Sequence, residues 1–257
     1  MSATKVTERA SVLRCDNPGM MTLEGTNTWI LREGSGRAVV IDPGPDDEAH
    51  IAAVVEAAGE VALVLFTHRH FDHTDALARI VDLTGAPTRS TDPEFCRDGE
   101  PLVDGEIIDV DGLLIEVLAT PGHTNDSTCF VLGAEGSLFS GDTILGRGTT
   151  IVAHPDGVLG PYLDSLAHIR ELVEEGLATR ILPGHGPVID DPAAVVDFYL
   201  EHRAERLEQV RAAVEAGAVT PREVVERVYS DVDEILWPAA DLSVAAQLTY
   251  LQEQQPS

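Results

Sequence analysis

The stretch "VALVLFTHRHFDHTDAL", residues 61–77, runs from an apolar segment directly into a cluster of titratable side chains. The cluster consists of His68, His70, Asp72, His73 and Asp75. The apolar part predicts a buried strand and the polar part a strand-to-helix loop, where α/β folds usually carry function. Side chains two residues apart on an extended chain point to the same side, so His68 and His70 can face one partner. Asp72 and His73 follow at the start of the next predicted helix, and two adjoining metal pockets are therefore geometrically possible.

Three further apolar runs end in Gly-rich turns that carry the same residue types. These turns are "LATPGHTNDST" with His123, "LFSGDTILG" with Asp142 and "RILPGHGP" with His185. Imidazole and carboxylate ligands suit zinc, and also iron or manganese. The repeated placement at strand ends therefore indicates a shared metal centre. The remaining histidines lie in helical or open contexts and are interpreted as ordinary surface residues: His50, His154, His168 and His202.

The short apolar runs, with amphipathic segments between several of them, predict an α/β sandwich rather than one doubly wound sheet. The predicted strands are 26–31, 37–42, 61–66, 113–120, 127–133, 137–141 and 179–184. The predicted helices are 46–58, 74–84, 161–175 and 192–216. Strand signals stop after about residue 203 and three helices follow, one of them beginning with Thr220 and Pro221 as N-cap and first helical residue. We therefore predict a large domain over 1–203 and a small helical, winged-helix-like domain over 204–257.

Composition restricts the possible partners. The formal net charge of −27 opposes attraction of polyanions, so the overall charge does not favour nucleic acid as a partner. The three cysteines, Cys15, Cys96 and Cys129, are odd in number and widely separated, which fits a reducing cytoplasm better than a disulfide framework. The first residues lack the apolar core of a signal peptide, and no apolar run approaches the roughly 18 residues of a membrane span. We expect a cytoplasmic protein that does not bind membranes.

The pattern H-x-H-x-D-H, followed by His, Asp and His, resembles that of the metallo-β-lactamase superfamily in its binuclear hydrolase branch. It is matched in full at His68, His70, Asp72, His73, His123, Asp142 and His185. The resemblance implies a four-layer αββα sandwich and two divalent metal ions, with zinc as the first expectation. It implies that one metal is held by His68, His70 and His123. It implies that a second is held by Asp72, His73 and His185, and that Asp142 bridges both.

The resemblance also implies a reaction. A hydroxide that bridges two metals would attack a carbonyl carbon or a phosphorus atom, with Asp72 both binding metal and orienting the nucleophile. True β-lactamases carry a cysteine or a non-ligand residue where this chain has Asp142, so antibiotic hydrolysis is not the expected native activity. A carboxylate at this position is typical of the glyoxalase-II-like and nuclease branches.

Three longer stretches, 16–31, 140–152 and 182–210, are similar to the beta-lactamase-like protein 2 group. The mitochondrial member of that group is an endoribonuclease acting on single-stranded RNA, so the resemblance favours a phosphodiester hydrolase. The alternative is a thioester or ester hydrolase similar to glyoxalase II or to the polyketide thioesterases, and the acidic composition does not oppose it. From His202 onward five arginines stand against ten acids, and no strand pair for a wing is visible, so we do not expect the tail to bind DNA.

Substrate contacts are predicted from loops that the resemblance places near the metals: Asn27, Asn125, Arg147, Thr149 and Thr150. Arg69 and Arg147 are candidates for local phosphate contacts. The substrate is therefore expected to be either a small molecule or single-stranded RNA. Packing of the tail on a second subunit would make the protein a homodimer, and this alternative stays open.

Overall fold

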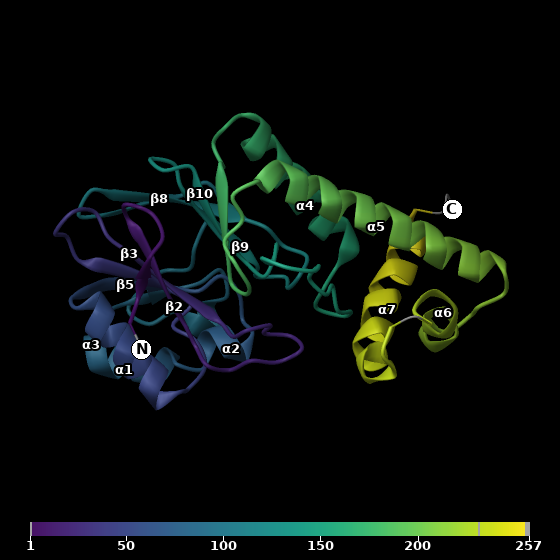
Figure 1. Ribbon diagram of the computed structural model, residues 1–257, viewed down its shortest axis with the longest axis horizontal. Helices are drawn as coiled ribbons and strands as arrows, with labels where there is room; N and C mark the ends of the chain where they lie inside the picture. Colours follow the sequence, from purple (N-terminus) through teal and green to yellow (C-terminus); the bar gives the residue numbers. More distant parts are fainter. Residues whose placement is uncertain (1, 231, 255–257) are drawn as a thin grey trace.

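Two β-sheets face each other in the computed structural model (Figure 1), which describes residues 2–230 and 232–254. The strands of the first sheet lie side by side in sequence order. They are β1 Thr4–Lys5, β2 Ala10–Arg14, β3 Asn27–Leu31, β4 Ala38–Ile41, β5 Val61–Leu65 and β6 Thr88–Arg89. The first four strands pair antiparallel, whereas β4, β5 and β6 are parallel. The parallel part therefore brings the carboxyl ends of β4 and β5 to the same edge.

The second sheet has five strands in the order β11-β10-β9-β8-β7. They are β7 Ile107–Val110, β8 Leu113–Ala119, β9 Thr128–Leu132, β10 Ser137–Gly141 and β11 Arg180–Pro183. Neighbours from β7 to β10 are antiparallel, and β10 and β11 are parallel. The carboxyl ends of β10 and β11 therefore also meet at one edge.

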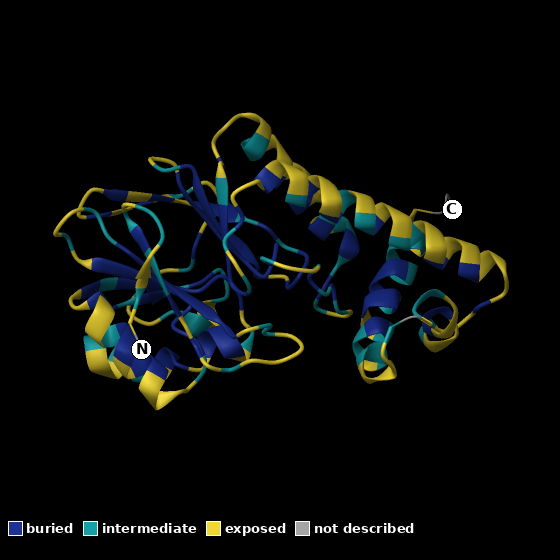
Figure 2. Ribbon diagram, viewed as in Figure 1, coloured by how far each residue is buried: buried dark blue, intermediate teal, exposed yellow. Residues whose placement is uncertain are grey.

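The core between the sheets is built from side chains that alternate inward along each strand. Trp29 of β3 meets Phe139 of β10 edge-to-face, with ring centroids 5.6 Å apart. Strands of both sheets supply the other members of this buried cluster, including Ile41, Leu65, Val117 and Phe130. Most of the strand residues are accordingly buried in Figure 2. This core fixes the separation of the two sheets, and with it the strand ends that carry the functional loops.

Helices cover the outer face of each sheet. α1 (Glu48–Ala58) and α3 (Leu77–Thr84) pack on the first sheet, and α4 (Leu159–Glu174) and α5 (Pro192–Glu215) pack on the second (Figure 1). The helices α1 and α5 begin at aspartate N-caps, Asp47 and Asp191, whose side chains accept backbone N–H groups. Together the four layers confirm the predicted αββα sandwich.

The C-terminal part is helical, as predicted. It contains α6 (Pro221–Val228), the short helix η2 (Glu234–Leu236) and α7 (Trp237–Glu253) packed against the second half of α5 (Figure 1). A capping box formed by Thr220 and Glu223 starts α6. No strand occurs after Pro183 in the part of the chain that the structure describes, so the winged-helix domain has no β-wing there. The predicted domain boundary at 203 and 204 falls inside α5, which serves both the sandwich and the C-terminal module.

All seven predicted strands are present, each within two residues of its expected limits. The helix predicted over 74–84 is instead divided into α2 (Phe71–Thr74) and α3, because the Ala76 N–H donates to Gly44 O outside the helix. Asp75 lies between the two helices and is exposed. The four strands β1, β2, β6 and β7 were not predicted, since two of them have only two residues and β7 follows a polar segment.

The surface assignment of His50 was wrong. The His50 side chain is fully buried, and its Nε2 lies 2.8 Å from Thr28 Oγ1. Burial lowers the pKa of His50 to about 4, so the ring stays neutral at physiological pH. Within the described residues, no helix is long and apolar enough to cross a membrane.

Candidate metal centre

The seven predicted ligands lie in loops that follow four strands. His68 and His70 follow β5, and α2 carries Asp72 and His73. His123 follows β8, Asp142 follows β10 and His185 follows β11. All are buried except His70, which is partly exposed. The structure therefore brings together all seven side chains, although they are spread over more than a hundred residues.

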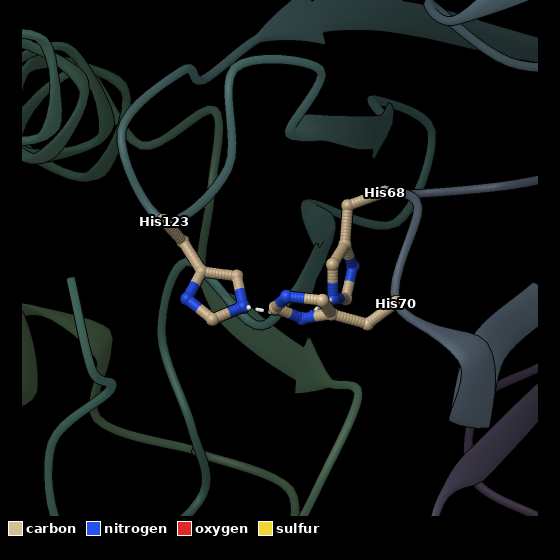
Figure 3. Close-up of side chains that lie close together, drawn as sticks. All are labelled: His68, His70 and His123. Carbon is tan, nitrogen blue, oxygen red and sulfur yellow. Dashed lines mark hydrogen bonds between the residues drawn. The ribbon is translucent and has the colours of Figure 1, made fainter. Parts of the chain in front are cut away.

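His68, His70 and His123 form the first group of potential ligands. His68 Nε2 lies 3.0 Å from His70 Nδ1, which lies 3.1 Å from His123 Nε2. Figure 3 shows His68 and His70 leaving one loop and His123 approaching from the opposite side. Three ring nitrogens that converge in this way match the donor set of a protein-bound zinc ion.

The second group consists of Asp72, His73 and His185. Their ligand atoms are close together: His73 Nε2 and His185 Nε2 are 3.2 Å apart, and Asp72 Oδ2 is 3.1 Å from His185 Nε2. Asp142 lies between the two groups, with Oδ2 3.3 Å from His185 Nε2 and 3.9 Å from His123 Nε2. Asp142 is thus positioned to bridge two ions.

Hydrogen bonds on the far side of the rings orient the inner nitrogens toward the centre. His73 Nδ1 lies 2.9 Å from Asp42 Oδ2. His123 Nδ1 lies 2.7 Å from Ile151 O, and His185 Nδ1 lies 3.2 Å from Gly25 O. Since these oxygens can only accept, each Nδ1 carries the proton and each Nε2 directs a lone pair inward. The two facing lone pairs of His73 and His185 need a proton or a cation between them.

Asp142 provides a second test of metal binding. Its Oδ1 is buried and has no hydrogen-bond partner in the described part of the chain. A buried carboxylate oxygen without a donor is costly, and a divalent cation would satisfy it. The donor set of imidazoles and carboxylates therefore fits divalent metal ions, with zinc among those that prefer it.

Asp42 was not predicted, yet it holds His73 and the Thr67 backbone in place. Its Oδ1 accepts the Thr67 backbone N–H at 2.8 Å, and its Oδ2 accepts Thr67 Oγ1 at 2.7 Å and His73 Nδ1 at 2.9 Å. The residue has φ +51°, a conformation that non-glycine residues rarely adopt. The sequence feature that could have identified Asp42 is its position at the end of the apolar run "RAVVID". Other acids and histidines of the site also follow apolar runs.

The two groups differ in their protonation. Burial lowers the pKa of His123 to about 4 and that of His68 well below its usual value. Burial alone would also lower the pKa of His73 and His185, but the neighbouring aspartates outweigh it. Asp72 and Asp142 raise the pKa of His73 to about 9, and Asp142 and then Asp72 raise that of His185 to about 11. Without metal, a proton therefore occupies the second group at neutral pH.

Metal binding at the second group is consequently expected to depend on pH. The nitrogen of an imidazole that binds a metal must be unprotonated. An ion that binds His73 and His185 therefore has to displace protons from rings whose pKa values are about 9 for His73 and about 11 for His185. The affinity of this group should increase about tenfold per pH unit, for each proton displaced, between about pH 6 and 8. The group with His123 is already neutral at pH 7 and should change little. Calorimetric metal titrations in buffers of different ionisation enthalpy count the released protons, and equal pH dependence at both groups would contradict the prediction.

The predicted substrate residues differ in burial and in hydrogen-bond partners. Asn27 is buried, and its amide donates to Pro183 O and Gly186 O at 3.0 Å each, so it holds the loop of His185 and has no donor left for a substrate. Asn125 is exposed and Arg147 pairs with Glu24 at 2.6 Å. Thr150 Oγ1 lies 3.2 Å from His123 Nδ1, behind the metal group.

Three of the predicted substrate residues, Arg147, Thr149 and Thr150, line the cavity at the metal groups, and Thr149 is partly exposed. Arg69, the other candidate for a phosphate contact, lies among three carboxylates at 3.3 to 3.8 Å: Asp92, Asp126 and Asp156. Its charge is therefore already compensated by the protein. Neither predicted arginine is free to serve a substrate phosphate without first leaving a carboxylate.

The metal groups open into a cavity of about 250 Å³. Its floor includes His70, Asp72, Asp142 and His185, and its walls are largely apolar. The apolar wall residues are Met20, Met21, Leu23, Phe71, Leu145 and Ile151. The cavity therefore places a largely apolar wall beside the two ligand groups.

Comparison with known families agrees with this geometry. The family described as "Metallo-beta-lactamase superfamily" matches residues 21–185, and the "Beta-lactamase associated winged helix domain" matches residues 220–255. The chain is 34% identical to the beta-lactamase-like protein 2 homolog of Drosophila melanogaster, over 95% of this chain and 87% of that protein. It is 35% identical to the atrochrysone carboxyl ACP thioesterase of Aspergillus chevalieri, over 97% and 80% of the two chains.

Among solved structures, a metallo-beta-lactamase family protein from Thermus thermophilus superposes with a TM-score of 0.80 at 22% identity. The superposition covers 96% of this chain and 94% of that protein, so the sandwich and the C-terminal module occur together in both. The family match covers more than half of the sequence, and the related chains extend along nearly all of it. We conclude that the chain belongs to the metallo-beta-lactamase superfamily, as a metal-dependent hydrolase with a C-terminal winged-helix domain.

Proposed function

We propose that this hydrolase cleaves a thioester with an apolar acyl group. Water adds to the carbonyl carbon, the carbon–sulfur bond breaks, and the products are a carboxylic acid and a thiol. Two divalent ions bound by the two ligand groups would supply an activated water molecule and stabilise the developing oxyanion. We propose zinc for both positions, because histidine and carboxylate ligands suit it.

The observation that carries the proposal is the apolar wall of the metal cavity. Met20, Met21 and Phe71 are 59, 54 and 69% exposed although they are large apolar side chains. They line the same cavity as the metal groups, where an acyl chain would cover them. Methionine adapts to ligands of different shape, which suits a pocket for flexible chains.

The chain's own residues would position the reacting groups. Thr26 Oγ1 donates to Asp72 Oδ2 at 3.2 Å, and Asn17 Nδ2 donates to Thr26 Oγ1 at 3.0 Å. This chain of hydrogen bonds fixes the Asp72 carboxylate at the cavity floor. Asp72 is proposed to orient the attacking water and to receive its proton, which then passes to the departing thiolate.

Single-stranded RNA is the second candidate, and the sequence resemblance favours it. A pair of metal ions also suits phosphoryl oxygens. The net charge of −27 and the pairing of Arg69 and Arg147 with carboxylates weigh against it, because nucleic-acid binding depends on phosphate neutralisation by free cations. Two relatives named as thioesterases, at 35 and 33% identity, add support to the first candidate.

A parallel turnover assay separates the candidates. The zinc-loaded protein is given acetyl and octanoyl thioesters of N-acetylcysteamine, bis(p-nitrophenyl) phosphate and a single-stranded RNA. We expect the octanoyl thioester to be cleaved with a kcat/KM at least about tenfold above the acetyl compound, since each buried methylene contributes about 0.8 kcal/mol. RNA cleavage without thioester cleavage would reject the proposal.

Two variants connect the result to the cavity. Met20→Ser removes part of the apolar wall and should reduce the preference for the longer acyl chain. Val219→Ser is the matched control, because Val219 is an exposed apolar residue between α5 and α6 that does not line the cavity. An equal effect of both substitutions would mean that the preference arises elsewhere.

A cytoplasmic location is also proposed. Cys15, Cys96 and Cys129 are all unpaired, which is usual where thiols are kept reduced. Burial raises the pKa of both Cys15 and Cys129 to about 11, so these thiols are poorly reactive.

A further inference from the structure

A second cavity, of about 230 Å³, lies between the loop 149–151, helix α5 and the C-terminal module. Its lining contains two arginines, in a chain whose net charge is −27. The lining includes His202, Arg203, Arg206 and Tyr229, and no carboxylate among the described residues belongs to it. We call this cavity the arginine recess.

Arg203 is a buried cation without a counter-ion. Its side chain projects from α5 and the residue is 8% exposed. One terminal nitrogen donates to Thr150 O, and the guanidinium lies 5.1 Å from the centre of the Tyr162 ring. Its Nε has no hydrogen-bond partner, and no carboxylate of the described residues pairs with it. A buried charge is costly when unpaired, so the positive charge of Arg203 favours an anion in the neighbouring recess.

Arg206 adds a second charge one turn along α5. It donates from Nη1 to Val228 O at 2.9 Å and stacks on the Tyr229 ring, 4.2 Å from its centre. His202 contributes a buried Nδ1 that also has no partner within the described residues. The stacked guanidinium keeps its planar shape and its remaining donors, which match the geometry of phosphate oxygens.

The arginine recess and the metal cavity share one wall. Thr149, Thr150 and Ile151 line both of them. Thr150 contacts both centres directly, because its Oγ1 lies 3.2 Å from His123 Nδ1 and its carbonyl oxygen accepts from Arg203. The recess and the metal cavity are therefore neighbours along the loop 149–151.

We propose that the arginine recess binds a phosphate group carried by the thiol portion of the thioester substrate. The proposal rests on the proposed function and adds the chemical class of the leaving group, a phosphorylated thiol. The acyl group occupies the apolar cavity, and the phosphate meets Arg206 and Arg203. The arginines come from α5, and the C-terminal module takes part in substrate selection by supplying the opposite wall, which includes Tyr229, Leu236 and Ala240.

The test compares two ligands that differ only in the phosphate. Pantetheine and 4′-phosphopantetheine are titrated calorimetrically into the zinc-loaded full-length protein. We expect 4′-phosphopantetheine to bind at least about tenfold more tightly, as charged hydrogen bonds contribute that much or more. The preference should disappear in Arg206→Gln and largely return in Arg206→Lys. Arg211→Gln is the matched control, since Arg211 is an exposed α5 residue that pairs with Glu208 outside the recess.

The outcomes separate this proposal from the previous one. Equal binding of the two ligands, or an equal loss in Arg206→Gln and Arg211→Gln, would overturn the phosphate site even if thioesters are cleaved. A similar preference for adenosine monophosphate over adenosine, removed by Arg206→Gln, would overturn the assignment to a thiol and point to nucleotides. Absence of thioester cleavage by the wild type would reject the proposed function, whereas the ligand pair reports on the recess without turnover. Asp231 lies outside the described residues, and the variant Asp231→Asn shows whether its carboxylate competes with the ligand phosphate for the arginines. If this variant prefers 4′-phosphopantetheine over pantetheine as strongly as the wild type does, the proposal is supported. If the preference appears only in the variant and not in the wild type, the proposal is overturned.

Discussion

Asp72→Asn is expected to lower kcat by about 10²–10⁴-fold, which is the usual contribution of a positioned acid or base. The amide keeps the shape of the carboxylate and can still accept from Thr26 Oγ1, so the loop should remain in place. It loses the negative charge 3.1 Å from His185 and the capacity to take up a proton. Rates on the preferred thioester and metal content, both measured against the wild type, distinguish lost chemistry from lost metal.

Asp75→Asn is the matched control for this experiment. Asp75 lies three residues further along the same segment, is exposed and belongs to neither ligand group. It should retain the wild-type kcat and metal content. Removing the metals with a chelator should abolish activity in the wild type, and zinc should restore it. Wild-type rates in Asp72→Asn, or full activity of the metal-free protein, would contradict the assigned centre.

Asp42→Asn is expected to weaken metal binding at the second ligand group by about 10–100-fold, as found for residues that orient metal ligands. The wild-type carboxylate accepts three hydrogen bonds, from Thr67 N, Thr67 Oγ1 and His73 Nδ1. An asparagine amide turns one oxygen into a donor, which leaves at least one of these buried donors unpaired at a cost of about 1–3 kcal/mol. Asparagine tolerates a positive φ, so the substitution changes the charge without straining the backbone.

Metal competition with a chromogenic chelator and denaturant unfolding of the metal-free protein measure the two effects separately. Asp111→Asn is the control, because Asp111 has nearly the same φ of +53° but pairs with Arg37 at the surface. It should leave the metal affinity unchanged and the unfolding free energy nearly unchanged, because exposed ion pairs contribute little to stability. Unaltered metal affinity in Asp42→Asn would show that His73 needs no partner behind it.

The two groups of potential ligands could be predicted because histidines and aspartates at characteristic spacings are recognisable in the sequence alone. His68 and His70 are two residues apart after an apolar run, and the same residue types recur after three later strands. Asp42 was missed because a single aspartate at a strand end also fits an ordinary turn. Its role depends on His73, 31 residues away, which no local pattern indicates.

The features that the sequence did not predict concern side chains whose partners are distant in sequence. The role of Asn27 in holding the His185 loop was not predicted, because its amide donates to carbonyl groups more than 150 residues away. His50 has the spacing of any helical residue, and only the packing of α1 on β3 places it against Thr28. The apolar walls of the cavity are equally non-local, since Met20 and Ile151 come from separate loops.

Helix α5 has a consequence for engineering chimeric enzymes. Tyr199, near its start, packs with the sandwich, whereas Val210 and Ala213 belong to the core of the C-terminal module. A fusion joint or a stop codon at 203 would split one continuous helix and remove Arg206 from the arginine recess. Exchange of the C-terminal module between relatives is better made in the connection 216–219, after α5 ends and before α6 begins. Such a graft would carry the recess arginines with the hydrolytic half, and the partner module would supply only the opposite wall.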